Sequence, residues 1–503
     1  MEIKMKKIMI LFTVLAMFFI VSCDNGSDSK DTADTGDTSS ETGDTSGDTG
    51  EQPSDTGDTG NADTGEQPAD TGDADPADTG DTGNADTGDS GDSGDSDTGD
   101  TSAETWESKY KKADEHAENV SEDIVNASNG LGMKIFKVLA SEASGKNLMI
   151  SPLSISIAMS MVTNGASGEN VTEMKEVLGF GKMEFSEINS QFAHLVQSLV
   201  EADKDLALEI ANSVWMDDEF APDVKQDFID VLKEFYDAAF FTEDFQDEST
   251  AGKINSWVSE KTHGKIDKIV EKIGPTAVMY LINALYFKAA WTTSFDKNST
   301  YEGGFTLSDG TESKANYMGF AYDQEEPEFY SYSSEWGDEN GYSVVRIPYG
   351  RDVFAFYGIV PNHDNKTNID KFIAKIAENG IDSYFANLVK CKFPVKLPKF
   401  KFAYEKSLVD VFKGLGMEKA FVEGAFMNIA GEPHAPFISD IYHKTFIEVN
   451  EEGTEAAAVT SVEVGDNAMP SGFYATRPFV FVIRDDRTGS VLFIGKVENP
   501  SPE

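Results

Sequence analysis

The sequence predicts one large α+β domain over residues 121–503. Two observations lead to this class. Apolar residues at helical spacing dominate the first part of this region, and strand-like apolar or alternating runs dominate the part that follows Thr276. No shift in composition divides the region, so we expect its helices and strands to share a single core.

The individual elements follow from local patterns. Ser151 and Pro152 form a helix start, with a capping residue before a proline, and Gly165 ends that helix. Helices are expected at 121–144, 153–164, 171–179, 185–202, 222–237, 249–262, 368–377 and 405–413. Strands are expected at 277–287, 343–348, 353–360, 389–393, 393–402, 445–450, 478–484 and 490–497.

Residues 1–23 have the pattern of an export signal. Three lysines precede an apolar run at 8–21, which is short for a membrane span. The run ends in Ile20-Val21-Ser22-Cys23, which resembles the bacterial lipobox, where a peptidase cuts before the cysteine and the cysteine carries lipid. We therefore expect an exported protein, lipid-anchored through Cys23 at a bacterial cell envelope, with its domain extracellular or periplasmic. An ordinary signal peptide with a chance cysteine is the alternative.

Residues 24–120 are predicted to be an acidic, low-complexity, disordered linker. From 24 to 102 there are 24 acidic residues against one lysine, and no Leu, Ile, Val, Met or aromatic residue. Such a chain cannot bury enough apolar surface to offset its conformational entropy, and it would span roughly 50 Å or more. Its Asp-Thr-Gly repeats lack the flanking hydrophobic strands of an aspartic protease, and its clustered Asp lack an ordered calcium loop.

Charge and motif content limit the function classes. The net charge of −48 disfavours phosphate contacts, so we expect no nucleic-acid partner. No metalloprotease, nucleophile-elbow, phosphate-loop or paired-cysteine motif occurs, and the six histidines lack metal-ligand spacing. We therefore predict no enzyme, no metal and no cofactor, although a triad built from distant residues leaves no local signature. Cys391 lies in a strand-like run, where a buried or half-buried thiol is the usual case.

Seven short segments stand out along the later chain. Residues 147–155 read Asn-Leu-Met-Ile-Ser-Pro-Leu-Ser-Ile, residues 283–291 read Asn-Ala-Leu-Tyr-Phe-Lys-Ala-Ala-Trp, residues 397–400 read Leu-Pro-Lys-Phe, residues 415–417 read Leu-Gly-Met, residues 443–458 read His-Lys-Thr-Phe-Ile-Glu-Val-Asn-Glu-Glu-Gly-Thr-Glu-Ala-Ala-Ala, residues 477–481 read Arg-Pro-Phe-Val-Phe, and residues 493–495 read Phe-Ile-Gly. Taken together and in this order, these segments resemble the serpin family over residues 124–500. The acidic stretch 321–336 and the residues 426–429 depart from the family pattern. The resemblance implies helices around a large, mostly antiparallel central sheet, with an exposed reactive-centre loop within residues 448–479.

What the resemblance implies for function is inhibition of a serine-type or cysteine protease. The protease forms an acyl-enzyme with the loop, and the cut loop then inserts into the sheet and distorts the protease. The matching hinge comprises Glu451, Glu452, Gly453, Thr454, Glu455, Ala456, Ala457 and Ala458. Taken as a strand, the loop has one uncharged face of small or β-branched residues from Thr454 to Val464. A segment patterned for burial but presented to a protease indicates a metastable native state, for which serpin loop insertion is a known example.

Family spacing locates the scissile bond. In the family, the residue before the cut lies fourteen positions after the hinge glycine and twelve before a phenylalanine of the family pattern. Gly453 and Phe479 occupy these two positions here, and both place the bond at Asn467–Ala468. Residues 445–476 contain no Lys or Arg, so the expected target is not trypsin-like. Elastase-like, subtilisin-like and Asp- or Asn-accepting proteases stay open.

Five further residues match family positions that control sheet opening. Ser151, Ser154, Asn283 and His443 match a polar cluster beneath the sheet, and Trp291 matches an aromatic residue where the loop joins it. Helix capping, a satisfied core polar group and plain packing are the simpler interpretations. We expect a monomer. The functional alternatives are a non-inhibitory serpin-like binding or adhesion lipoprotein and a solute-binding lipoprotein.

Overall fold

Nine α-helices occur in the part of the chain that the computed structural model describes, which is residues 105–320, 327–334, 341–362, 369–454 and 472–501. They are α1 (Trp106–Glu118), α2 (Glu122–Glu142), α3 (Pro152–Thr163), α4 (Glu169–Val177), α5 (Phe185–Val200), α6 (Gln226–Tyr236), α7 (Thr250–Lys261), α8 (Ile369–Asn379) and α9 (Val409–Gly414). Most of them lie early in the chain, as the sequence predicts. None of these helices combines the length and apolar character needed to cross a membrane.

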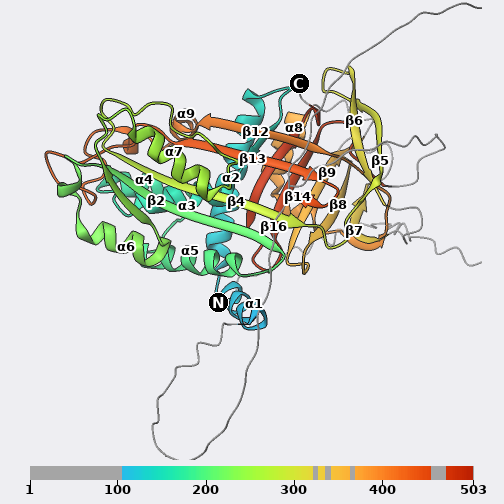
Figure 1. The fold of residues 1–503 in the computed structure, drawn as a ribbon, viewed down its shortest axis with the longest axis horizontal. Coiled ribbons are helices and arrows are strands. Elements are labelled where there is room, and N and C mark those ends of the chain that lie inside the picture. Colours follow the sequence, from blue (N-terminus) through green and yellow to red (C-terminus); the bar gives the residue numbers. More distant parts are fainter. Residues whose placement is uncertain (1–104, 321–326, 335–340, 363–368, 455–471, 502–503) are drawn as a thin grey trace, which may run out of the picture. The chain divides into compact units, whose positions relative to one another are not determined.

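A six-stranded sheet forms one side of the molecule, with strand order β12-β13-β14-β4-β2-β3. Its strands are β2 (Leu206–Asp217), β3 (Ala239–Glu243), β4 (Met279–Ala290), β12 (Phe400–Ser407), β13 (Tyr442–Asn450) and β14 (Gly453–Thr454). All neighbours are antiparallel except β2 and β3. The long strands β2 and β4 run side by side across Figure 1. This sheet matches the large, mostly antiparallel sheet expected above.

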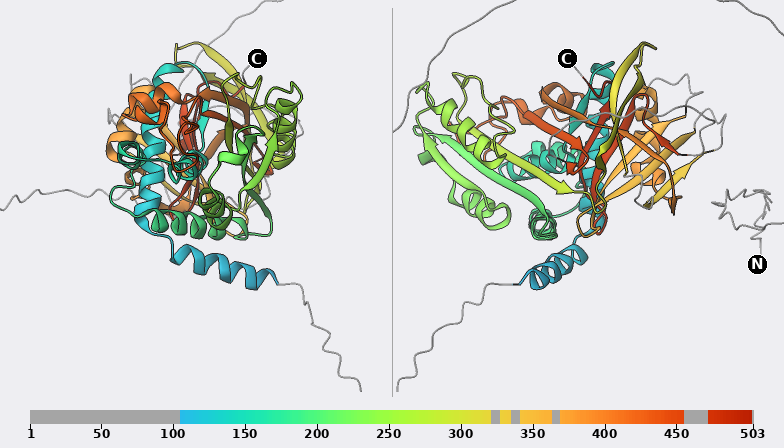
Figure 2. Two further views of the ribbon diagram at one scale, coloured as in Figure 1. Left: turned by 90° about the vertical axis from the view of Figure 1, so that its left-hand side faces the viewer. Right: turned by 45° about the vertical axis from the view of Figure 1, so that its right-hand side comes forward.

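Two further sheets lie at the other side. The seven-stranded sheet has the order β1-β17-β16-β9-β8-β7-β10, and the four-stranded sheet has the order β15-β11-β6-β5. Their strands are β1 (Leu148–Ile150), β5 (Asp296–Thr306), β6 (Glu312–Gly319), β7 (Glu328–Ser333), β8 (Tyr342–Tyr349), β9 (Phe354–Pro361), β10 (Val389–Lys392), β11 (Val395–Pro398), β15 (Phe473–Tyr474), β16 (Phe479–Asp485) and β17 (Val491–Val497). In the right-hand view of Figure 2, most of these strands (yellow to red) lie at the end of the domain opposite to the C-terminal end of β2 and the N-terminal end of β4 (green).

The helix α3 is buried along almost its whole length because it packs between β4 and β17. Its first turn is capped by Ser151, whose hydroxyl accepts a hydrogen bond from the Ser154 backbone N–H at 3.1 Å. Two buried aromatic residues of the seven-stranded sheet, Phe356 and Phe481, stack at 6.0 Å. One core therefore joins the central sheet to the seven-stranded sheet through α3.

The predicted linker ends too late, because α1 lies inside the range 24–120. Thr105 caps α1, and Ala113 is its one buried residue. Asp114 accepts hydrogen bonds from the guanidinium groups of Arg351 and Arg487, both at 2.9 Å. Lys109 forms an ion pair with Glu201 at 2.5 Å. These polar contacts hold a helix whose apolar residues alone are too few to predict a folded segment.

The predicted helix at 405–413 is also wrong in its first half. β12 continues to Ser407, where it pairs with Tyr442, so the sheet ladder overrides the local pattern and only α9 remains helical. Cys391 lies on β10 and is half-buried, with its sulfur 3.4 Å from the Ser331 hydroxyl, which confirms the expected strand and burial. Within the acidic stretch 321–336 the structure describes β7.

Candidate functional site: the hinge and the gap between β4 and β13

The two strands β4 and β13 run parallel to each other with the short strand β14 between their C-terminal ends. β14 is antiparallel to both, pairing Gly453 with Asn450 and Ala290, and Thr454 with Val449 and Ala289. No other ladder joins β4 to β13 within the described residues. Gly453 of the predicted hinge and Thr454, the first residue of the predicted uncharged face, are therefore already in the sheet, at one end of a gap between the two strands.

Gly453 fits this position because it has no side chain. Its φ is +151°, and a Cβ built on it would lie 1.9 Å from the backbone oxygen of Ala289. Backbone atoms of a paired strand cannot move away without breaking the ladder, so no other residue can occupy this site unchanged. The close approach, as well as backbone freedom, explains a glycine at the hinge.

Thr454 is buried and its hydroxyl lies 2.8 Å from the hydroxyl of Tyr349. Tyr349 stacks on Trp291 with ring centroids 4.5 Å apart and planes within 10°. Burial raises the pKa of Tyr349, so the phenol stays protonated and can donate to Thr454. Thr454 thus faces the core, as expected for the first residue of the uncharged face.

Trp291 closes the end of the gap by binding the chain that leads into β14. Its indole Nε1 donates to the backbone oxygen of Asn450 at 2.8 Å, and its backbone N–H donates to that of Glu452 at 3.0 Å. The structure therefore places Trp291 where the loop joins the sheet, as the resemblance implies.

The acidic hinge residues are held differently. The Glu451 side chain is 1% exposed, and its carboxylate accepts from the Thr300 hydroxyl at 2.6 Å and lies 3.0 Å from Lys399 Nζ. A buried carboxylate needs such partners, because an unpaired one would be strongly destabilising. Glu452 is more exposed and pairs with Lys297. The turn between β13 and β14 is thus fixed by ion pairs on both acidic residues.

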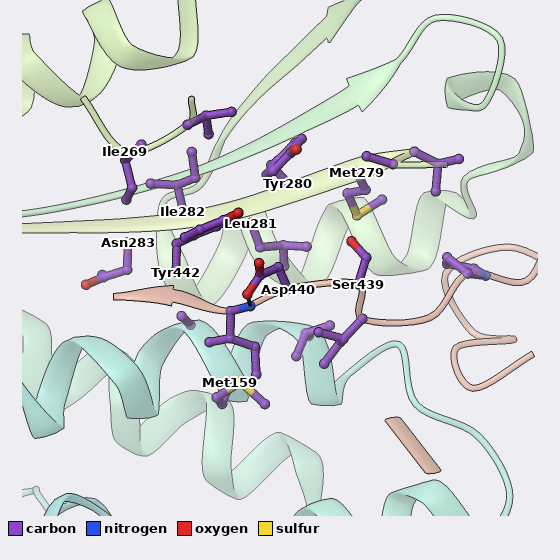
Figure 3. A pocket seen from close by; sticks show the side chains of 18 of the residues that line it. Met159, Ile269, Met279, Tyr280, Leu281, Ile282, Asn283, Ser439, Asp440 and Tyr442 are labelled. Carbon is purple, nitrogen blue, oxygen red and sulfur yellow. Dashed lines mark hydrogen bonds between the residues drawn. The ribbon is translucent and has the colours of Figure 1, made fainter. Parts of the chain in front are cut away.

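At the other end of the gap, β4 and β13 border a cavity of about 510 Å³. The residues around it come from β4, from α3 and from the chain that leads into β13. Figure 3 shows Met159 on α3, Leu281 and Asn283 on β4, and Tyr442 at the start of β13 around this space. The gap is therefore occupied by β14 at one end, and it opens into the cavity at the other.

Three of the four predicted polar residues meet beside this cavity. His443 is buried, and its Nε2 accepts a hydrogen bond from the Ser151 backbone N–H at 3.1 Å. The Ser151 hydroxyl in turn caps Ser154, so the start of α3 is joined to the start of β13. Burial lowers the pKa of His443 to about 4, which keeps the imidazole neutral and able to accept.

Asn283 also borders the cavity but bonds elsewhere. Its amide donates to Asn212 Oδ1 at 2.8 Å, and Asn212 donates to the backbone oxygen of Tyr236 at 2.7 Å. The Asn283 Oδ1 is buried and has no hydrogen-bond partner among the described residues. The expected cluster is therefore divided between the two sides of the gap in this structure.

Sequence reasoning missed Tyr349, Asn212, Thr300 and Lys399. Asn212 and Asn283 are directly paired in the β2–β4 ladder, so recognising β2 would have brought them together. No local signal marks the other three, which reach the hinge only through tertiary structure. The predicted bond Asn467–Ala468 and the hinge residues 455–458 lie outside the described residues.

Comparison with known proteins agrees with this geometry. The family model described as "Serpin (serine protease inhibitor)" matches residues 126–500. Serpin-Z10 of Arabidopsis thaliana is 32% identical over 383 residues, covering 72% of this chain and 94% of its own. The native-state structure of Tengpin, a thermophilic serpin, superposes with a TM-score of 0.63 at 32% identity, covering 75% of this chain and 94% of that one. A thyroxine-binding globulin structure in complex with thyroxine gives a TM-score of 0.66 at 26% identity, covering 76% and 99%.

The start of the loop is paired between the parallel strands β4 and β13 of the large sheet. Both the matching family model and these relatives identify the protein class that has this arrangement. The chain belongs to the serpin family. Members of this family are generally protease inhibitors rather than catalysts, and some are non-inhibitory. The helix α1 precedes the residues that the family model matches.

Proposed function

We propose that this serpin is a suicide-substrate inhibitor of a serine-type protease. The observation that carries the proposal is β14, in which Gly453 and Thr454 already pair with both neighbours of the gap. The next residues continue an uncharged face of Ala and β-branched side chains as far as Val464. They can follow Thr454 into the gap without bringing a charge beneath the sheet.

The chemistry begins at the bond Asn467–Ala468. The protease hydroxyl attacks the Asn467 carbonyl carbon, the C–N bond breaks, and the new amine of Ala468 leaves with a proton. The ester holds the protease on Asn467 while the loop before it inserts between β4 and β13. The insertion moves the protease along the sheet before water can hydrolyse the ester. The inhibitor works only if insertion is faster than this hydrolysis.

The target follows from the loop composition. The absence of Lys and Arg from residues 445–476 argues against a trypsin-like protease, whose specificity pocket needs a cation. A protease with a small pocket that cleaves near Ala468, or one that accepts Asp466 or Asn467, fits better. A cysteine protease that forms the corresponding thioester is a second class of target.

We further propose that the protein works outside the cytoplasm on a lipid anchor. Cys23 follows the apolar segment 8–21 and would carry the lipid, and the acidic stretch 24–102 would hold the inhibitor away from the membrane surface. Metabolic labelling with a radioactive fatty acid tests this: the parent chain should be labelled and the Cys23→Ser variant should not. A labelled variant would contradict the anchor.

The test of inhibition uses a panel of elastase-, subtilisin- and caspase-like proteases. The full chain should form an SDS-stable complex with one of them. Thr454→Arg should convert it to a substrate, because the buried Thr454 site beside Tyr349 cannot accept a guanidinium during insertion. Thr172→Arg, exposed on α4, is the matched control and should still form the complex. Clean loop cleavage of the parent without any complex would contradict the proposal.

The second candidate is a non-inhibitory binding protein, and the cavity of about 510 Å³ favours it. Apolar residues such as Met159 and Leu281 border this space, which suits a small apolar ligand. The dye 8-anilinonaphthalene-1-sulfonate separates the two functions. Under the inhibitor proposal, its binding should disappear after loop cleavage, because the inserted loop closes the gap. Binding that survives cleavage, in a chain that forms no complex, would favour the second candidate.

A further inference from the structure

The helices α1 and α5 bring two histidines together. His116 on α1 and His194 on α5 place their Nδ1 atoms 3.1 Å apart, with ring centroids separated by 5.3 Å. Both residues are partly exposed. In the neutral state one Nδ1–H donates to the other Nδ1, so the two nitrogens face each other across the contact between α1 and α5.

This separation also fits two ligands of one metal ion. Zinc binds imidazole nitrogen at about 2.0–2.1 Å, so two nitrogens at a tetrahedral angle are about 3.3 Å apart. Imidazole suits Zn²⁺, Cu²⁺ and Ni²⁺, whereas Mg²⁺ and Ca²⁺ prefer oxygen. We propose that His116 and His194 form a two-histidine site for a divalent transition metal, with Zn²⁺ as the simplest occupant, that links α1 to α5.

Metal binding at the site needs a change of tautomer. The proton that one Nδ1 donates to the other moves to an Nε2, which leaves the lone pairs of both Nδ1 atoms free to bind the metal. In the described chain, no carboxylate or thiol completes a three-ligand set with the pair, so water fills the remaining positions.

The position of the site gives it a consequence for the fold. The helix α1 lies before the residues that match the family, and it is held chiefly by polar contacts such as those of Asp114 with Arg351 and Arg487. Coordination across the interface would add a bond that dissolved salt does not screen in the way it screens exposed ion pairs. The metal would link α1 to α5 and so stabilise the attachment of α1 to the rest of the domain.

The test titrates the full chain with Zn²⁺ by calorimetry at neutral pH, in an excess of Mg²⁺ that occupies weak acidic sites. We expect one tight site per chain, weakened about tenfold or more in His116→Gln and in His194→Gln. His434→Gln is the control, because His434 is an exposed histidine that pairs with Asp223 instead. Unchanged affinity in both of the first two variants would overturn the site.

Two further measurements guard against a variant that merely loses α1. Hydrogen exchange of the amides of residues 106–118 should slow on adding Zn²⁺ to the parent chain, and unchanged exchange would overturn the link between helices. Electron paramagnetic resonance of the parent chain with one equivalent of Cu²⁺ should show coupling to two imidazole nitrogens. A spectrum with oxygen ligands alone would contradict the proposal without any substitution.

Discussion

The two ends of the gap between β4 and β13 differ in what fills them. At the C-terminal ends of both strands, β14 completes the ladder and its residues are buried under Trp291 and Tyr349. Toward the N-terminal ends, the strands border a cavity of about 510 Å³, where His443 and Asn283 are bonded to different neighbours. One end therefore has a strand between β4 and β13, and the other has a cavity in its place.

Under the proposed inhibitory mechanism, this difference indicates where insertion would release free energy. Each residue that enters the sheet would add backbone hydrogen bonds and bury small apolar side chains, which stabilises the sheet. In the present structure this gain is limited, at the filled end, to the two residues of β14. The empty end, at the cavity, is where the proposed insertion would continue.

The largest expected effect comes from cutting the loop. Cleavage after Asn467 should let the loop fill the empty end and add roughly ten net hydrogen bonds of about 1 kcal/mol each. We expect the melting temperature to rise by about 12 °C. Differential scanning calorimetry before and after cleavage measures this, with mass spectrometry to locate the cut. An unchanged melting temperature would mean that the cavity is not a reserved strand position.

The next effect acts on the filled end. Gly453→Ala places a Cβ against the backbone of Ala289, so β14 must leave the sheet. We expect the number of inhibitor molecules consumed per protease to rise about tenfold. The reason is that an increase of about 1–2 kcal/mol in the activation free energy of loop insertion slows insertion roughly tenfold. Titration of protease activity measures this ratio. The control Gly252→Ala has open space around its Cβ within α7 and should leave the ratio unchanged.

A third effect tests the empty end through pH. Burial lowers the pKa of His443 to about 4, below the ordinary value near 6.5. Between these two pH values His443 is protonated in the unfolded chain but neutral in the native state. This contribution to stability is complete above about pH 6.5 and falls by about 3 kcal/mol as the pH drops to about 4. Urea midpoints measured from pH 7 to pH 5 should fall less steeply in His443→Gln. The same pH dependence of the urea midpoint in the parent and in His443→Gln would contradict this assignment. His434→Gln, which changes an exposed histidine, is the control and should keep the pH dependence of the parent.

The smallest effect separates two asparagines of the same ladder. Asn212→Ala leaves both Asn283 and the Tyr236 backbone oxygen without a donor or acceptor, and should cost about 2 kcal/mol. Asn283→Ala removes a side chain that makes a single bond on this side of the gap, and should cost about 1 kcal/mol or less. Urea unfolding of both variants gives the two values. A larger cost for Asn283 would indicate that it also holds β13 in solution.

Most of the helices and the later strands could be predicted from the sequence, because apolar periodicity and capping residues specify them locally. The strand β2 was missed although Leu206, Leu208, Val214 and Met216 lie on its buried face. The polar Asn212 interrupts that face and the apolar Trp215 lies on the other, so the alternation is hard to recognise in the sequence. The hinge residues Gly453 and Thr454 were recognised because the family resemblance runs along one continuous segment, but their pairing with β4 and β13 was not predicted. Tyr349 was not, because its contact with Thr454 joins residues 105 positions apart. The helix α1 escaped prediction because charged contacts hold it.

The attachment of α1 also has a mechanical consequence. The chain enters the domain at this helix, so any tension on the residues before Thr105 acts first on a segment with one buried side chain. Its ion pairs and hydrogen bonds, with Asp114 at their centre, yield more easily than the packed helix α2 behind them. Unwinding its 13 residues from 1.5 to about 3.4 Å per residue releases roughly 25 Å of chain. If the chain were pulled from its N-terminal side, α1 would therefore be expected to unfold before α2 and before the sheets, and its unfolding would lengthen the connection without disturbing them.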